Sequence, residues 1–393
     1  MLFRFWACKC TTFQAVTEIF GLFFAKKVLF MCFFHPYDPF FCSKRRIFAA
    51  MKAERTYFSR VLLEWFGTHG RDLPWRHTHD AYLIWLSEII LQQTRVEQGR
   101  GYWERFVRRW PTVELLASAT EDEVLREWQG LGYYSRARNL HAAAQQVVAA
   151  GGFPRSVEGL LRLRGVGAYT AAAIASFAFG VPAAVVDGNV YRVMSRYFGI
   201  DVPIDSTQGQ RLFAALAGEM IPADRPADYN AAIMDFGAMQ CTPTSPACAE
   251  CPLAESCAAR GAGRVAELPV KQGRTRVQER RLIYIYIRCK GEVAIRKRGA
   301  GDFWQGLWEP VLVEEPAAAQ GCSDVAEVMK EAAVVAKDVV HVLSHRRLLC
   351  DFYLAEPKEK PALPAGYIWV KEQALDDYAK PRLIERLLER LPA

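Results

Sequence analysis

The chain has 393 residues, a length typical of two or three domains, and 51% of its residues are hydrophobic, which excludes wholesale disorder. Its net charge is +7, but residues 1–50 carry +5 of this, so the remainder carries only +2. Net charge alone is therefore a weak argument for a nucleic-acid partner, and such a partner would need local basic surfaces.

Residues 1–50 are rich in Phe and Cys, and their apolar runs, Phe20–Ala25 and Val28–Phe34, are separated by two lysines. Neither run reaches the roughly 18 apolar residues of a membrane span, and no small-residue cleavage site follows them. We interpret this segment as a leader that is mis-started or non-structural, with Met51 as the start. A transit peptide is the alternative.

From Tyr57 to about Gly199, apolar residues recur at a spacing of three to four, and short Gly/Pro breaks interrupt them. This pattern predicts successive helices, and two more follow at residues 205–220 and 229–239. We therefore expect residues 51–262 to form an all-α domain.

Glu88 lies in an apolar stretch and is expected to share a helix face with Trp85 and Gln92. Most helix glutamates are solvated, but the apolar neighbours here leave little of the helix for water. A carboxyl partly buried in this way has a raised pKa, as a general acid requires. Gln92 and Gln93 are neutral groups suited to probing an opened base pair.

Gly165-Val166-Gly167 follows one apolar helix and precedes a helix of small residues. Glycines permit a close backbone approach, and the new helix offers free N–H groups at its positive end. This geometry can hold a DNA phosphate without reading a base. An ordinary αα-hairpin turn is the alternative.

Asp187, in Val-Asp-Gly-Asn, follows the helix that this turn begins. It could simply cap the next helix through its carboxylate. We favour a functional role because the hairpin would bring Asp187 beside the bound DNA backbone.

Four cysteines in the pattern C-x6-C-x2-C-x5-C share one turn-rich loop, residues 241–257. Disulfides, a zinc ion and an iron–sulfur cluster are the three possible uses of this loop. Zinc sites usually repeat a short pair, so the two long gaps favour a cluster. The odd total of 11 cysteines does not fit a secreted disulfide scaffold and favours a reducing cytoplasm. The candidate ligands are Cys241, Cys248, Cys251 and Cys257.

The composition changes to basic and polar at residues 263–279, which we interpret as a linker. Residues 280–393 then alternate β-branched runs with two helical patterns and are expected to form an α+β domain. The expected strands are 282–287, 293–296, 308–313, 341–343 and 348–354, and the expected helices are 325–329 and 381–391.

The hairpin, the Val-Asp-Gly-Asn motif, the Glu88 helix and the cysteine loop together resemble the helix–hairpin–helix superfamily of DNA glycosylases. The segments 71–76 and 130–138 resemble its adenine DNA glycosylase branch, which removes adenine mispaired with 8-oxoguanine. The resemblance is close over residues 57–257 and looser in the C-terminal domain.

The resemblance implies roles for individual residues. Glu88 would protonate the adenine, Asp187 would stabilise the cationic sugar, and Tyr169 and Asn189 would support these two groups. Arg71, Leu73 and Trp75 would line the adenine pocket. Gln93 and one of Tyr133 or Tyr134 would wedge into the duplex beside 8-oxoguanine. The loop cysteines would hold a [4Fe–4S] cluster.

The segment 303–310 resembles the start of the Nudix-like recognition domain of these enzymes. The Mg²⁺-binding carboxylate cluster of a Nudix hydrolase does not follow it, so we expect no phosphohydrolase activity. Ser344 and His345 match the family loop that senses 8-oxoguanine, whereas Leu343 replaces its usual aromatic residue.

We therefore expect a monofunctional glycosylase acting on double-stranded DNA with A:8-oxoguanine or A:G mispairs. It should be a cytoplasmic, nucleoid-associated monomer with no membrane association. One alternative is a glycosylase/lyase of the endonuclease III type, which needs a lysine where this chain has Tyr169. The other is a non-catalytic, cluster-bearing DNA-binding protein, which retention of Glu88 and Asp187 disfavours.

Overall fold

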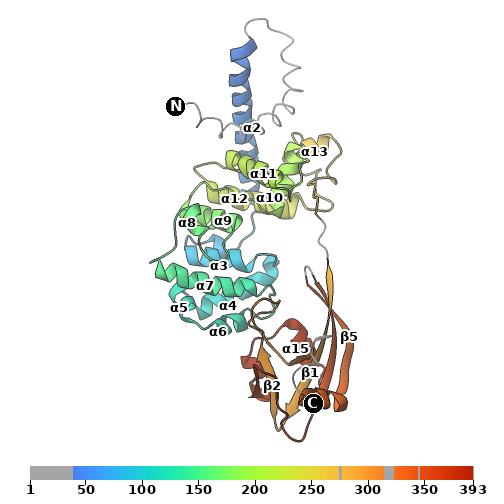
Figure 1. Ribbon diagram of the computed structural model, residues 1–393. Coiled ribbons are helices and arrows are strands. Elements are labelled where there is room, and N and C mark those ends of the chain that lie inside the picture. Colours follow the sequence, from blue (N-terminus) through green and yellow to red (C-terminus); the bar gives the residue numbers. More distant parts are fainter. Residues whose placement is uncertain (1–38, 274–276, 314–322, 344–345, 393) are drawn as a thin grey trace, which may run out of the picture. The chain divides into compact units, whose positions relative to one another are not determined.

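The computed structural model describes residues 39–273, 277–313, 323–343 and 346–392 (Figure 1). The chain divides into two compact units. The first comprises the described residues up to Ile84 together with Arg155–Leu161 and Gly167–Gly273. The second comprises Trp85–Pro154, Arg162–Val166 and the described residues from 277 onward. The expected order of an all-helical part followed by an α+β part is confirmed.

The first unit is helical, and polar caps define where several of its helices begin. Ser156, Asp187 and Ser206 each accept a hydrogen bond from the backbone N–H three residues on. The core is built by apolar side chains of α2, α10, α11 and α12. The helices are α2 (Pro39–His69), η2 (Pro74–Arg76), α8 (Val157–Leu160), α9 (Ala168–Phe179), α10 (Gly188–Phe198), α11 (Thr207–Met220), α12 (Pro226–Asp235), the π-helical η3 (Phe236–Gln240) and α13 (Ala258–Gly261).

Residues 264–273, which fall in the expected linker, pack as part of this first unit. Leu268 is buried, and the Val270 carbonyl accepts a 3.0 Å hydrogen bond from the Ile204 N–H. The Asp205 carboxylate accepts from the N–H groups of Gln272 and Gly273 at 2.9 and 2.7 Å. The segment is therefore anchored as far as Gly273.

The second unit contains a helical lobe, which we define as residues 85–149 of α3 to α7. Phe106, Leu116, Trp128 and Leu140 are buried within it. A capping box between Thr120 and Glu123 begins α6. The helices are α3 (Ala81–Ile90), α4 (Val96–Arg109), α5 (Val113–Ser118), α6 (Glu121–Glu127) and α7 (Ser135–Ala149).

The second unit also contains a seven-stranded mixed sheet with the strand order β3-β2-β1-β6-β5. β4 pairs with β1 and β7 with β2; among the described residues, β1 and β6 pair in parallel and the other pairs are antiparallel. The elements are β1 (Gln278–Cys289), β2 (Glu292–Lys297), β3 (Trp308–Glu309), β4 (Val311–Val313), α14 (Ser323–Glu331), β5 (Ala333–Leu343), β6 (Arg346–Ala355), β7 (Tyr367–Lys371), η4 (Glu372–Asp377) and α15 (Arg382–Leu388).

Alternate residues of β1 face opposite sides of the sheet, as its two-residue period requires. Leu282 and Tyr284 share a core cluster with Leu383 of α15. Ile285 shares another cluster with Val325 of α14. The two helices therefore cover opposite faces of the sheet.

β7 was not among the strands expected from sequence, and two of the expected strands differ in their bounds. The expected strand 308–313 is divided into β3 and β4 at Pro310, which has no N–H for a ladder. The expected strand 341–343 is only the end of β5, which begins at Ala333. Register shifts between Val334 and Val339 break the alternation by which a strand is recognised. No helix of the described residues is long and apolar enough to cross a membrane.

Candidate active site and cluster loop

Asp187 of the first unit caps α10. Its two carboxylate oxygens accept 2.8 Å hydrogen bonds from the Val190 N–H and from Asn189 Nδ2. Desolvation nevertheless raises the pKa of Asp187, against the opposing effects of these bonds and of Arg192. Asp187 therefore does cap the helix, as the alternative interpretation expected. Its carboxyl also has a perturbed pKa, and perturbed pKa values are typical of functional sites.

Arg192 connects this cap to the cysteine loop. It donates to Asn189 Oδ1 at 2.8 Å, to the Cys241 carbonyl at 2.7 Å and to the Gly237 carbonyl at 2.5 Å. Its side chain is buried, so these oxygens compensate a charge that has left water. Sequence reasoning missed Arg192, although its position after the Val-Asp-Gly-Asn motif could have drawn attention to it.

Arg196, one helical turn after Arg192, holds the same loop. It donates to the carbonyls of Thr242 and Pro243 at 2.7 and 3.0 Å, and its Nη1 lies 3.4 Å from Cys241 Sγ. The two arginines share one face of α10 because they are four residues apart. They fix the entry to the cysteine loop.

The four loop cysteines are free thiols and partly buried. Cys241, Cys251 and Cys257 pack against the core of the first unit. Desolvation, together with the smaller effect of the neighbouring cysteines, raises the pKa of Cys251 to about 11. None of these four cysteines forms a disulfide in the structure. In the described residues, no three His, Cys, Asp or Glu side chains converge on a position for a single metal ion.

The loop fits a multinuclear cluster in its chemistry. Thiolates are the usual protein ligands of iron–sulfur clusters. Burial raises the pKa of Cys251 and of Cys257, so these thiols would require a bound metal to become stable thiolates. The guanidinium of Arg196 beside Cys241 adds a positive charge that favours such a cluster.

Arg71, Leu73 and Trp75 lie on and before η2 of the first unit. Leu73 and Trp75 are buried. Arg71 forms an ion pair with Asp235 at the end of α12, with Nη2 2.5 Å from Oδ1, and Arg76 pairs with the same carboxylate at 2.7 Å. Sequence reasoning missed Asp235, whose partners are about 160 residues away along the chain.

Tyr169 lies in the first turn of α9 and is partly buried, with its hydroxyl 3.8 Å from Met234 Sδ. In the preceding turn, Gly165 has φ = +75° and Gly167 caps α9 without a side-chain bond. The side chain of Val166 is buried, so Val166 can contact DNA only through its backbone.

Glu88 belongs to the second unit and is only 7% exposed, so the expected burial is confirmed. Trp85, Leu86 and Ile89 beside it are buried as well. The expectation that Gln92 shares its helix face is wrong, because α3 ends at Ile90 and Gln92 lies in the following turn.

Arg136 of α7 explains this early helix end. Its Nη1 donates to the carbonyls of Ile89, Ile90 and Gln92 at 3.0, 2.8 and 2.6 Å. A guanidinium thus replaces the N–H groups of a further helical turn. The chain then adopts φ = +56° at Gln93, a strained conformation for a non-glycine residue.

Tyr133 and Tyr134 differ sharply in environment. Tyr133 is 45% exposed, has φ = +48° and has the Arg136 guanidinium 5.6 Å from its ring centre. Tyr134 is 5% exposed, and its hydroxyl donates to the Lys380 carbonyl at 3.3 Å. Of the two rings, that of Tyr133 is the more exposed.

The candidates Ser344 and His345 lie outside the described residues. The ends of the strands that flank them are described. Arg346 pairs with Asp302 at 3.3 Å, and the Trp304 ring lies 5.7 Å from that of His341. The segment 302–304 therefore supports the base of this loop.

Three family models match the chain. They are the HhH-GPD superfamily base excision DNA repair protein at residues 86–216, the iron-sulfur binding domain of endonuclease III at 241–257 and the NUDIX domain at 283–390. A solved thermostable thymine-DNA glycosylase is similar at 32% identity with a TM-score of 0.51, covering 54% of this chain and 99% of that one.

Adenine DNA glycosylases are among the curated relatives. That of Homo sapiens is 44% identical over 219 residues, covering 53% of this chain and 40% of the human protein. That of Buchnera aphidicola subsp. Schizaphis graminum is 32% identical over 254 residues, covering 64% of this chain and 73% of the relative. The chain thus spans less than half of the human protein but most of the bacterial one.

Fold and matches together define a helix–hairpin–helix DNA repair protein with an iron–sulfur loop and a NUDIX-type domain. The match over residues 241–257 confirms the expected [4Fe–4S] cofactor. The chain belongs to the adenine DNA glycosylase family.

Proposed function

We propose that the protein is a monofunctional DNA glycosylase that removes adenine mispaired with 8-oxoguanine or guanine in duplex DNA. The observation that carries the proposal is Glu88, an acid buried at 7% exposure in an apolar helix. A buried carboxyl is an effective proton donor to a base, because burial disfavours its ionised form. Asp187, with its raised pKa, supplies the second carboxyl.

In the proposed reaction the adenine nucleotide is flipped out of the duplex, which costs a few kcal/mol and least at a mismatch. Glu88 donates its proton to a ring nitrogen of the adenine, and the N-glycosidic bond breaks with both electrons leaving on the base. The carboxylate of Asp187 stabilises the cationic sugar. Water adds to the sugar carbon and one of its protons passes to the Glu88 carboxylate, which restores the acid and leaves free adenine and an abasic site.

Other residues would bind and position the DNA. Asn189 orients Asp187 through its 2.8 Å hydrogen bond, and Tyr169 would support the same pocket. Arg71, Leu73 and Trp75 would line the adenine pocket, and the backbone of Gly165–Gly167 would hold a phosphate. Gln92 and Gln93 would probe the opened pair, and Ser344 and His345 would contact 8-oxoguanine.

Of the two adjacent tyrosines, we assign the wedge to Tyr133. Its exposed ring and positive φ support this choice, whereas the hydroxyl of Tyr134 is already engaged. Cys241, Cys248, Cys251 and Cys257 would hold the cluster, which when bound crosslinks the loop and supplies no electron to the hydrolysis.

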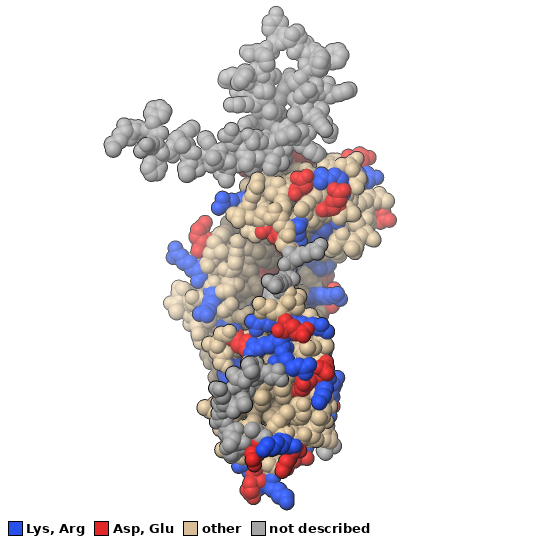
Figure 2. Space-filling model, turned by 45° about the vertical axis from the view of Figure 1, so that its right-hand side comes forward, with Lys and Arg blue, Asp and Glu red and all other residues tan. Residues whose placement is uncertain are grey.

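We further propose a monomer of the cytoplasm and nucleoid, with residues 51–262 as the glycosylase domain and 280–393 as the recognition domain. Basic and acidic side chains are interspersed on the face shown in Figure 2. We propose that DNA binding uses local backbone contacts such as those of the hairpin.

The test is adenine release from duplexes with adenine opposite 8-oxoguanine, guanine or thymine. Glu88→Gln should still bind the 8-oxoguanine duplex but release adenine at least a hundredfold more slowly, because it has no proton to donate. Unchanged release by Glu88→Gln would remove this residue from its role. A duplex with thymine opposite guanine tests the activity named for the similar thymine-DNA glycosylase.

Borohydride trapping tests the absence of a lyase step. A lyase attacks the sugar with an amine, and the position after the hairpin is Tyr169 rather than a lysine. We expect little covalent adduct, and abundant adduct would favour the endonuclease III type instead.

A further inference from the structure

Within the second unit, the helical lobe meets the sheet domain through polar contacts. Arg126 of α6 pairs with Asp377 at 3.1 Å, and Asp122 pairs with Lys297 of β2. The Arg138 guanidinium donates to the Gln305 carbonyl at 2.5 Å. These side chains are exposed or only partly buried, so the ion pairs among them contribute little by themselves.

The centre of this interface consists of better buried groups, most of them uncharged. The Gln129 Oε1 accepts a 3.0 Å hydrogen bond from the Lys380 N–H, and its Nε2 donates to Glu385. The Tyr134 hydroxyl donates to the Lys380 carbonyl at 3.3 Å and accepts from the Gly130 N–H at 3.3 Å. Both backbone groups of Lys380 are thus bound by one short stretch of the lobe.

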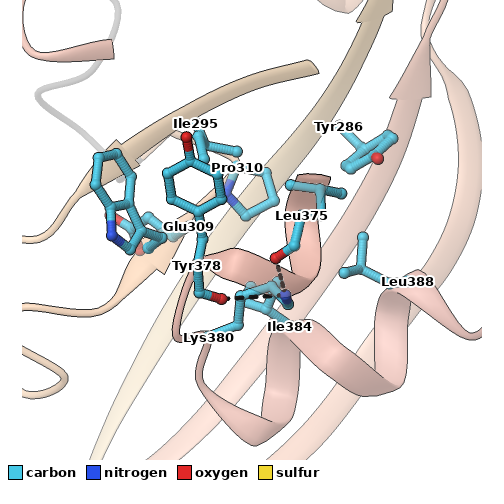
Figure 3. A pocket seen from close by; sticks show the side chains of 10 residues that line it. Tyr286, Ile295, Glu309, Pro310, Leu375, Tyr378, Lys380, Ile384 and Leu388 are labelled. Carbon is cyan, nitrogen blue, oxygen red and sulfur yellow. Dashed lines mark hydrogen bonds between the residues drawn. The ribbon is translucent and has the colours of Figure 1, made fainter. Parts of the chain in front are cut away.

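The Lys380 side chain holds its own backbone segment in the position from which it contacts the lobe. Its buried ammonium donates to the carbonyls of Leu375 and Tyr378 (Figure 3). Burial lowers the pKa of Lys380. The ammonium has exchanged its water contacts for hydrogen bonds to two carbonyls of its own segment. These bonds hold residues 375–380 together where they contact the lobe.

Residues 129–134 of the lobe, which contact this segment, include the exposed Tyr133. Gly130 and Gly132 adopt positive φ without strain, but Tyr133 also has positive φ, which is strained for a non-glycine residue and must be held in place by its surroundings. Gln129 and Tyr134 hold one side of this loop. Arg136 holds the other, because it donates to the Gly132 carbonyl at 3.2 Å and to the residues after Glu88.

We propose that Gln129, Tyr134 and Lys380 form a contact through which the recognition domain positions the Tyr133 loop and so sets the discrimination between 8-oxoguanine and guanine opposite adenine. The inference rests on the proposed function. All three are positioning residues, since they act on the loop and not on the reacting atoms. The contact adds an energetic link between the domain that senses the oxidised base and the ring that enters the duplex.

The experiment compares Gln129→Ala, Tyr134→Phe and the control Gln145→Ala in the full-length protein. Gln145 is a matched control because its amide bonds within the lobe, to the Ala117 carbonyl at 3.5 Å. The readouts are single-turnover adenine release opposite 8-oxoguanine and opposite guanine, and hydrogen exchange of amides 129–134 and 375–380.

We expect Gln129→Ala to reduce the ratio of adenine release opposite 8-oxoguanine to release opposite guanine about tenfold, which corresponds to about 1.4 kcal/mol. Tyr134→Phe should reduce the same ratio by a smaller factor. Release opposite guanine should stay within about twofold, since the chemistry is untouched. Exchange should accelerate in both segments. Gln145→Ala should change neither readout.

The outcomes separate this inference from the function on which it rests. Wild-type protein that releases no adenine from any duplex would contradict the proposed function and the coupling with it. Wild-type release with an unchanged ratio in Gln129→Ala would overturn the coupling alone. An equal fall in both release rates would also overturn it, because that is a general loss of activity.

Discussion

At the scale of single residues, Asp187 combines a structural and a proposed chemical role. An N-cap aspartate is usually stabilised as its anion by the helix dipole and the backbone N–H groups. Desolvation outweighs these effects here and raises the pKa of Asp187. The cap therefore holds a carboxylate that is less well solvated than an ordinary one, and such a charge can interact strongly with a nearby cation.

Asp187→Asn should lower adenine release about a hundredfold or more, because an amide cannot neutralise the cationic sugar. In the unsubstituted protein, the raised pKa means that release should fall on the acid side at a higher pH than an ordinary aspartate would cause. Asp205→Asn is the control, since Asp205 also accepts backbone N–H bonds but lies away from the motif. Release rates measured against pH would contradict the role if both variants behaved alike.

Asp235 is fully buried beneath Arg71 and Arg76 and gives a stability prediction. Burial opposes its ionisation, but the hydrogen bonds and charges of the two arginines prevail and lower its pKa. The stability that ionised Asp235 contributes is therefore fully present above pH 3.8, its ordinary pKa. This stability is lost as the pH falls through the lowered pKa of the folded protein. Asp235→Asn should destabilise the first unit by about 3 kcal/mol at pH 7, because two partly buried cations lose their fully buried partner.

Urea unfolding at several pH values measures this effect. The difference between Asp235→Asn and the unsubstituted protein should shrink as pH falls below 3.8. Asp228→Asn, which breaks the exposed pair with Arg225, should cost less than about 1 kcal/mol. A difference for Asp235→Asn that is independent of pH would contradict the assignment.

At the scale of elements, local patterns predicted the helices, the hairpin and the buried strand β1 from sequence. The end of α3 was not predictable in this way, because Arg136 lies more than 40 residues further along the chain. Asp235 and Arg192 were missed for the same reason, since their partners are distant in sequence. Periodicity predicts which face of an element is buried, and long-range polar pairs require the fold.

The hairpin turn offers a matched pair of glycines. A Cβ on Gly165 would lie 2.7 Å from Asn139 Cβ, and its φ of +75° disfavours any L side chain. Gly167 has φ = −93° and nothing within 4 Å of a built Cβ. Gly165→Ala should cost about 1–2 kcal/mol or more. Gly167→Ala should stay within about 0.5 kcal/mol.

Thermal unfolding and DNA-binding anisotropy would test the pair. We expect Gly165→Ala to weaken duplex binding as well, because the turn that presents the α9 amides would shift. Equal destabilisation by the two substitutions would show that the left-handed conformation at Gly165 does not constrain the hairpin.

At the scale of the whole molecule, the cluster loop belongs to only one of the two units. Its carbonyls satisfy the buried guanidinium groups of Arg192 and Arg196. Arg192 in turn holds Asn189, which orients Asp187. Order in the loop is therefore linked to order at the candidate catalytic aspartate through three consecutive hydrogen bonds.

Removing the cluster by oxidation and chelation should consequently disturb the first unit selectively. Amides of α10 and of residues 236–257 should exchange faster, because a freed loop no longer satisfies the two arginines. The helical lobe and the sheet of the second unit should keep their protection, since none of the loop cysteines lies in that unit. Adenine release should fall as the visible absorbance of the iron–sulfur cluster is lost. Equally faster exchange across both units would show that the cluster stabilises the whole chain. Unchanged protection of the α10 amides would show that Arg192 does not transmit the order of the loop to Asp187.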